Sequence, residues 1–164
     1  MRIEDRTNAE YTIREATLAD EDALVGHRIG MFTDMGVSFD ATALDAEFRE
    51  WLRRMMPAGV YRAWVVETDS HAIAAGGGIT ILPWPPGPHY MGDRLAFVYN
   101  VYTEPPHRRR GLARHVMDAI HDWCRVEGIA SVALNASADG RPLYESLGYE
   151  VSPAPMMFLP IVRV

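Results

Sequence analysis

Residues 94–127, RLAFVYNVYTEPPHRRRGLARHVMDAIHDWCRVE, decide the fold of this chain. They begin with Arg94–Thr103, a run of aromatic and β-branched residues that is the strongest strand signal in the sequence. A short turn with two prolines follows, and the residues from Arg108 to Ala113 then open a helix that we expect to reach about Glu127. The stretch therefore predicts a strand, an arginine-rich turn and a helix in direct succession.

Before this stretch the pattern predicts a strand followed by two helices. We expect the strand at residues 11–16, after a polar lead of ten residues, and helices at residues 17–35 and 40–56. Thr17 and Asp20 have the spacing of a capping box, with Asp in place of the usual Glu or Gln.

Residues 60–67 and 71–82 predict a hairpin. Three glycines at 76–78 interrupt its second arm and predict a bulge or a close backbone approach. The proline-rich residues 83–88 predict an exposed loop.

After the helix, the pattern predicts a short strand, a short helix and a closing strand, at residues 129–134, 139–147 and 156–162. A chain of 164 residues without repeats fits one domain of mixed α/β class, spanning residues 1–164. The exposed closing strand could pair across a homodimer.

Composition excludes several classes of chemistry. All 16 basic residues are arginines, which excludes a catalytic lysine, and one cysteine excludes a disulfide framework and a cysteine-based zinc cluster. The two nearest histidines on the expected third helix are six residues apart, so we expect no metal site. No run approaches the roughly 18 apolar residues of a membrane helix, and the start lacks a secretory signal, so we expect a cytoplasmic protein with no membrane partner.

The charge is distributed unevenly. The net charge is −6, and residues 1–50 hold twelve acidic side chains against five arginines. Broad nucleic-acid binding is disfavoured because it needs a basic face. A local anion site remains open, since Arg108, Arg109, Arg110 and Arg114 cluster at the start of a helix.

That helix start has the chemistry of a phosphate site. The first N–H groups of a helix lack intrahelical partners and lie at the positive end of its dipole. Gly111 lets the backbone approach a ligand closely, and the small Ala113 keeps the helix start uncrowded. A pyrophosphate fits this arrangement; a solvated basic loop, or a contact for RNA or an acidic protein, are the alternatives.

Further residues downstream give the sequence a resemblance to a known family. Arg108-x-x-Gly111-x-Ala113, Val132-Ala133-Leu134-Asn135 and Tyr144-x-x-x-Gly148-Tyr149 occur at the separations found in the GCN5-related N-acetyltransferase (GNAT) superfamily. Residues 94–150 resemble its acetyl-CoA-binding and catalytic core. The resemblance implies a twisted, mostly antiparallel sheet of six to seven strands with about four helices, splayed between the fourth and fifth strands.

The resemblance also implies acetyl-CoA as acetyl donor and direct transfer to a primary amine in a ternary complex. The residues it implies at the CoA site are Val101, Tyr102, Thr103, Arg108, Arg109, Arg110, Gly111, Leu112, Ala113, Arg114, Asn135 and Tyr144. Asn135 either binds the pantetheine arm or caps the following turn. A non-catalytic acyl-CoA-binding or sensor module, or a transferase with a longer acyl donor, are the alternative functions.

Tyr144 is the expected catalytic acid. A tyrosine with a pKa of about 10 can donate to a departing thiolate, whose thiol has a pKa of about 8.5. The alternative is an amphipathic core residue. We expect the oxyanion to meet a backbone N–H near Val101. No carboxylate lies on the 94–103 strand, so Asn100, Tyr99, a water chain or an amine that arrives deprotonated are all open as the route for the amine proton.

For the amine acceptor we expect a cleft lined by the first two helices. Its candidate residues are Arg28, Phe32, Trp84 and Asn100, with Met31, Met35 and Phe39 beside them. The negative charge of residues 1–50 favours a cationic amine. Methionine and phenylalanine at helical spacing are also typical of a core, so the identity of the acceptor stays open.

Overall fold

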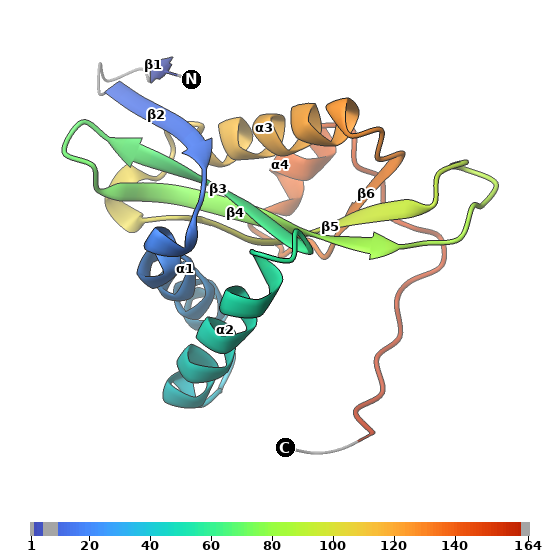
Figure 1. Cartoon of the computed structure of the whole chain (residues 1–164), viewed down its shortest axis with the longest axis horizontal. Helices are drawn as coiled ribbons and strands as arrows, with labels where there is room; N and C mark the ends of the chain where they lie inside the picture. Colours follow the sequence, from blue (N-terminus) through green and yellow to red (C-terminus); the bar gives the residue numbers. More distant parts are fainter. Residues whose placement is uncertain (1, 5–9, 162–164) are drawn as a thin grey trace.

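The computed structural model describes residues 2–4 and 10–161, which form one six-stranded sheet with helices on both faces (Figure 1). The strands are β1 (Arg2–Glu4), β2 (Glu10–Glu15), β3 (Tyr61–Thr68), β4 (Ile73–Pro83), β5 (Arg94–Thr103) and β6 (Ser131–Leu134). The helices are α1 (Glu21–Asp34), α2 (Ala41–Met55), α3 (Leu112–Val126) and α4 (Arg141–Ser146), with 3₁₀ turns at Leu18–Asp20 and Pro105–His107. None of the helices in these ranges is long and apolar enough to cross a membrane.

The sheet is mostly antiparallel and follows chain order from β1 to β6. Only β5 and β6 are parallel among the pairs described, because α3 carries the chain back across one face between them. This confirms the predicted mixed α/β class, although the strands are not all the expected ones.

The sheet opens between β5 and β6. Their pairing runs from Leu95 opposite Ser131 to Val98 opposite Leu134, whereas β5 continues to Thr103. The last residues of β5 therefore have no β6 partner in the described sheet. This is the splay that the family resemblance implied between its fourth and fifth strands, which correspond to β5 and β6 here.

A bulge interrupts β5 next to this opening. Asn100 and Val101 both lie opposite the single residue Gly77 of β4, and Asn100 has φ = 56°. The irregularity predicted at Gly76–Gly78 is confirmed.

Two apolar clusters hold the helices to the sheet. Leu112, Val116 and Ile120 of α3 are completely or almost completely buried against one face, as their helical spacing predicts. Phe48 and Leu52 of α2 pack against the other face. Burying each such side chain contributes about 1.5–3 kcal/mol to the free energy of unfolding.

The predicted capping box fixes the 3₁₀ turn Leu18–Asp20, which leads directly into α1. Thr17 accepts from the Ala19 N–H, and the Asp20 carboxylate accepts from the Thr17 N–H at 2.8 Å. The same carboxylate accepts two 2.8 Å bonds from Arg14, which lower the pKa of Asp20. The cap therefore joins β2 to the first helix.

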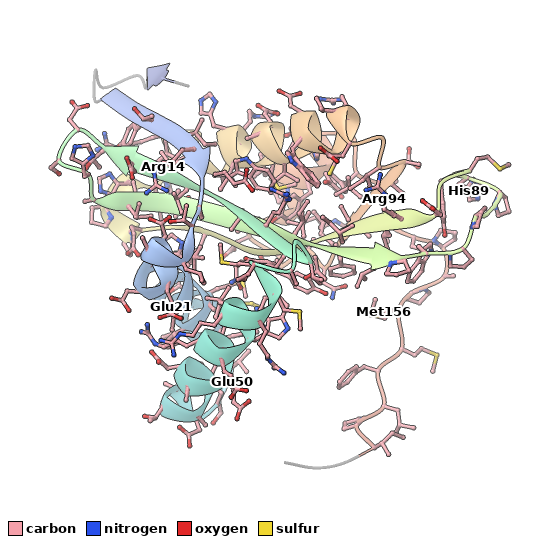
Figure 2. All side chains as sticks on the ribbon, viewed as in Figure 1. Arg14, Glu21, Glu50, His89, Arg94 and Met156 are labelled. Atoms are coloured by element: carbon pink, nitrogen blue, oxygen red, sulfur yellow. The ribbon has the colours of Figure 1, made fainter. Side chains whose placement is uncertain are left out.

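The two ends of the chain differ from the prediction. Residues 2–4 form β1 beside β2, within the segment expected to be a polar lead. The closing strand predicted at residues 156–162 is wrong for residues 156–161: they form no strand and run away from the sheet (Figure 1; Met156 is labelled in Figure 2). Met157 and Phe158 are 93% and 88% exposed. A β-favouring composition makes no strand without a neighbouring backbone, and prolines at 153, 155 and 160 lack the N–H that pairing needs. Residue 162 lies outside the described residues.

The structure packs so closely around Gly78 that we expect no larger residue to fit there without a shift of the core. A Cβ there would lie 2.2 Å from the Tyr61 Oη and 2.8 Å from the Arg62 carbonyl oxygen. We expect Gly78→Ala to lower the free energy of unfolding by about 1–3 kcal/mol in urea denaturation, because the core must shift to admit it. The control is Gly26→Ala in α1, where a Cβ meets nothing within 4 Å; there we expect a gain of up to about 1 kcal/mol. Equal stability of the two variants would contradict the prediction.

Candidate active site

The arginine-rich turn between β5 and α3 exposes the start of a helix. Arg109 and Gly111 have φ values of 62° and 79°, so the chain turns sharply twice before Leu112. Gly111 provides no side-chain cap. The first hydrogen bond of the helical i to i−4 pattern runs from the His115 N–H to the Gly111 carbonyl and is 3.2 Å long. The three N–H groups before His115 therefore face outward from the helix end. This geometry suits an anion.

Arg108 anchors this turn. Its Nε donates to the Thr103 carbonyl at 2.9 Å, and its Nη2 donates to Asp34 at the end of α1 at 2.6 Å. The guanidinium lies 5.3 Å from the ring centroid of Tyr102. Arg108 therefore joins β5 to α1, whereas Arg109 is exposed and Arg114 donates to Ser146 of α4.

Four more residues predicted for the CoA site lie at the ends of β5 and β6, beside the opening of the sheet, whereas the Leu112 side chain is buried in the core under α3. Val101, Tyr102 and Thr103 are half-buried on the part of β5 that β6 does not pair. Asn135 follows the last residue of β6 and is exposed.

Tyr144 projects from α4 into the apolar cluster under α3. It packs edge-on against Tyr149, with ring centroids 5.9 Å apart, and burial raises the pKa of its hydroxyl. Tyr149 in turn is hydrogen-bonded to His121 at 2.7 Å. The Tyr144 hydroxyl therefore stays protonated at neutral pH.

A cleft of about 430 Å³ lies on the opposite face of the sheet, against α1 and α2. It brings together Arg28 and Asn100, whose side chains are hydrogen-bonded at 2.8 Å. The full lining is Arg28, Leu44, Glu47, Phe48, Trp51, Arg54, Tyr61, Thr80, Tyr99 and Asn100.

The cleft does not include two of the predicted acceptor residues. Phe32 lies beside it, with its ring centroid 5.2 Å from the Arg28 guanidinium. Trp84 is 41% exposed and follows β4 in the hairpin that ends near His89 (Figure 2), outside the lining.

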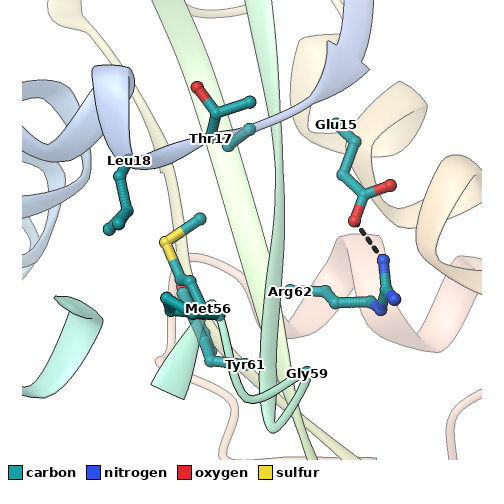
Figure 3. A pocket seen from close by; sticks show the side chains of 9 residues that line it. Glu15, Thr17, Leu18, Met56, Gly59, Tyr61 and Arg62 are labelled. Atoms are coloured by element: carbon teal, nitrogen blue, oxygen red, sulfur yellow. Dashed lines mark hydrogen bonds and ion pairs between the residues drawn. The ribbon is translucent and has the colours of Figure 1, made fainter. Parts of the chain in front are cut away.

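A second hollow, of about 360 Å³, lies where β2 ends beside the turn that follows α2 (Figure 3). Glu15 and Arg62 line it and form an ion pair of 2.5 Å (Figure 3). It contains none of the residues predicted for either site.

Comparisons with known proteins identify the family of the chain. A family model described as the acetyltransferase (GNAT) family matches residues 28–149. The chain belongs to the GNAT family. Members transfer acetyl groups, so this protein is classed with the transferases.

Solved structures share the GNAT fold over nearly the whole chain. A GCN5-related N-acetyltransferase from Ralstonia eutropha JMP134 is 34% identical, with a TM-score of 0.81 and coverage of 92% of this chain and 98% of that one. A predicted acetyltransferase from Clostridium acetobutylicum, with acetyl-CoA, is 24% identical at a TM-score of 0.82, covering 91% and 96%. Glucosamine-6-phosphate N-acetyltransferase from Arabidopsis thaliana is 22% identical at a TM-score of 0.66, covering 91% and 97%. No curated protein matches the chain.

Sequence reasoning missed several cleft residues of this GNAT chain. Tyr61 and Thr80 lie directly opposite each other in β3 and β4, so their side chains share one face of the sheet. A polar Thr80 in an otherwise apolar strand was the available signal, but only the register brings it to Tyr61 and Asn100.

His27 is another residue that the sequence did not single out. It is buried under β4 and β5, with its ring centroid 5.3 Å from that of Tyr102. Burial lowers its pKa to about 4, so it is neutral at pH 7 and adds no charge to the site.

We expect the ion pair between Arg108 and Asp34 to weaken the binding of CoA to this GNAT chain. Asp34 neutralises one of the arginines at the helix start, so Asp34→Asn makes the turn more positive. We expect CoA to bind about two- to fivefold more tightly at low salt. The gain is lost at about 1 M salt, because charges then interact over only about 3 Å. Isothermal titration calorimetry measures both, with Asp93→Asn at the far end of β5 as control. Weaker binding by Asp34→Asn at low salt would contradict a mainly electrostatic role.

Proposed function

We propose that this protein transfers the acetyl group of acetyl-CoA to a primary amine by direct attack within a ternary complex. The observation that carries the proposal is the opening of the sheet after Val98 of β5, beside the exposed start of α3. The edge of β5 and the start of α3 border this opening, and the proposal assigns Tyr144 of α4 to the sulfur of the donor. The amine cleft lies on the other side of β5.

The residues around the opening fit the donor. The N–H groups of Leu112–Arg114, with the nearby arginines, suit a pyrophosphate. Val101, Tyr102 and Thr103 supply a strand edge for the amides of the pantetheine arm, with Asn135 at the end of β6. Bound there, acetyl-CoA supplies the acetyl group as a thioester.

The chain's own groups then handle charge and protons. The bulge takes one of the two residues opposite Gly77 out of the regular ladder, so a backbone N–H near Val101 is available to the carbonyl oxygen as charge develops on it. As the C–N bond forms and the C–S bond breaks, Tyr144 donates its proton to the departing sulfur. The amine gives up its surplus proton to solvent, which the cleft reaches at exposed Glu47 and Arg54.

Thermal stability with CoA tests donor binding. A ligand at a hundred times its Kd stabilises a protein by about 2.7 kcal/mol, so acetyl-CoA and free CoA both raise the melting temperature clearly. Gly111→Asp places a carboxylate at the start of α3 and abolishes the rise. Gly128→Asp is the matched control, since Gly128 also has a positive φ and open space around it, but at the far end of α3. No rise at millimolar CoA in the unaltered protein would overturn the proposal.

Removal of the Tyr144 hydroxyl tests the acid. We expect Tyr144→Phe to lower kcat about 100-fold with little change in the Kd for CoA, because the proton reaches the sulfur only in the transition state. Because burial raises the pKa of Tyr144, the unaltered enzyme keeps this proton through neutral pH. Its kcat falls only above the usual tyrosine pKa of about 10. The Tyr144→Phe enzyme does not show this fall of kcat at high pH.

Tyr149→Phe is the matched control for this experiment. It removes the hydroxyl that bonds His121, and so affects stability rather than kcat. A Tyr144→Phe enzyme with full turnover would remove Tyr144 from the mechanism.

A further inference from the structure

Arg28 brings into the cleft a positive charge that no carboxylate of the described residues neutralises. Its guanidinium lies 5.2 Å and 4.9 Å from the ring centroids of Phe32 and Phe48. Its hydrogen bond goes to the neutral Asn100, and Glu47, the carboxylate that lines the cleft, makes no ion pair with it. Burial lowers the pKa of Arg28, which shows the cost of holding this charge away from water. A half-buried charge of this kind favours an anion beside it.

Three more polar atoms of the cleft make no hydrogen bond of good geometry, although the Tyr61 hydroxyl and the Asn100 amide lie near enough to interact with each other. They are the Tyr61 hydroxyl, the Thr80 hydroxyl and the Asn100 Nδ2, and the exposed fractions of these residues are 1%, 7% and 3%. Leaving such groups unpaired in the interior costs about 1–3 kcal/mol each. They therefore indicate a polar group that belongs in the cleft.

All of these atoms can donate a hydrogen bond. Arg28 has only donors, so the oxygen of the Asn100 amide faces it and the Nδ2 is the end left for a ligand. The two hydroxyls can rotate to donate as well. A cluster of a guanidinium, an amide N–H and two hydroxyls matches the four lone-pair positions of a carboxylate.

The spacing along β5 limits how far this anion lies from the reacting amine. Asn100 holds the anion end of the cleft, and Val101, beside which the proposed reaction occurs, is the next residue. Consecutive Cα atoms are about 3.8 Å apart. A reaction at the Val101 backbone N–H would therefore bring the amine close to the anion end of the cleft, so that few bonds would separate the two groups of the acceptor.

We propose that the acceptor is an α-amino acid, whose carboxylate is bound by Arg28, Asn100, Tyr61 and Thr80. Leu44, Phe48 and Trp51 give the remaining wall of the cleft an apolar and aromatic surface for the amino acid's side chain. The inference rests on the proposed function for the position of the amine, whereas the carboxylate subsite stands on the cleft alone.

Matched pairs of ligands test the proposal. Each of the common amino acids is compared with its α-carboxamide, which has the same side chain but no negative charge; because the amine of the amide is less basic, both rates are expressed per concentration of deprotonated amine. We expect kcat/KM for the preferred amino acid to exceed that for its amide about 10- to 100-fold, because the amide lacks the charged group to which the subsite donates its hydrogen bonds. An amide equal to or better than its acid in every pair, or a preference for the aminophosphonate analogue over the acid, would overturn the proposal.

Variants connect the preference to the residue. Arg28→Met removes the charge and Arg28→Lys keeps it without the planar fork, so the acid-to-amide ratio is expected to collapse in the first and to fall partly in the second. Arg125→Met, on the exposed face of α3, is the matched control and leaves the ratio unchanged. An unchanged ratio in a folded Arg28→Met protein would overturn the assignment of the carboxylate to Arg28.

A binding measurement separates this inference from the proposed function. The N-acetylated amino acid and its amide are titrated into the unaltered protein by calorimetry, with CoA present and no turnover. Tighter binding of the acid with no acetylation of any amine would contradict the proposed function and support the carboxylate subsite. Acetylation of simple amines with no discrimination between acid and amide would do the reverse.

Discussion

The site depends on one irregularity of the sheet, the two residues of β5 that lie opposite Gly77. Because of this extra residue, the consecutive Tyr99 and Asn100 both line the cleft under α1 and α2. Val101 then packs toward Val116 of α3 on the other face. In a regular strand these faces would alternate residue by residue. The bulge therefore connects the two sides of the sheet that a reaction between a donor and an acceptor would need.

The glycines of β4 make this arrangement sterically possible. At Gly77 a Cβ would lie 2.9 Å from Val116, and at Gly78 it would meet the Tyr61 hydroxyl. The absence of side chains lets α3 approach one face while Tyr61 occupies the other. The cost is the conformational entropy of three adjacent glycines in a strand, which burial of the surrounding apolar side chains offsets.

Local signals explain what the sequence could predict. The Thr17 and Asp20 cap and the apolar stripe of α3 are each decided within a few residues of chain, and the structure has both. The family motif added the expectation that the sheet opens after β5. The wrong strand at residues 156–161 had the right composition, but a strand also needs a neighbouring backbone, which composition does not record. Tyr61, Thr80 and Asn100 come together only through the register of three strands, so no window of the sequence could show that each has a polar atom without a hydrogen bond of good geometry.

The charge of the chain shows the same difference between local and long-range information. Residues 1–50 are strongly acidic, which suggested attraction of a cation. The structure uses several of these carboxylates within the fold: Glu21 and Asp45 pair with Arg49, and Asp34 pairs with Arg108. Exposed ion pairs of this kind add only about 0–1 kcal/mol each, but they leave little of that negative charge directed at the cleft. Arg28 comes from the same acidic segment and is desolvated between aromatic rings, where a charge acts over short distances with little screening. What a ligand meets in the cleft is decided by the charges that line it, and there the two arginines, Arg28 and Arg54, outnumber the one carboxylate, Glu47.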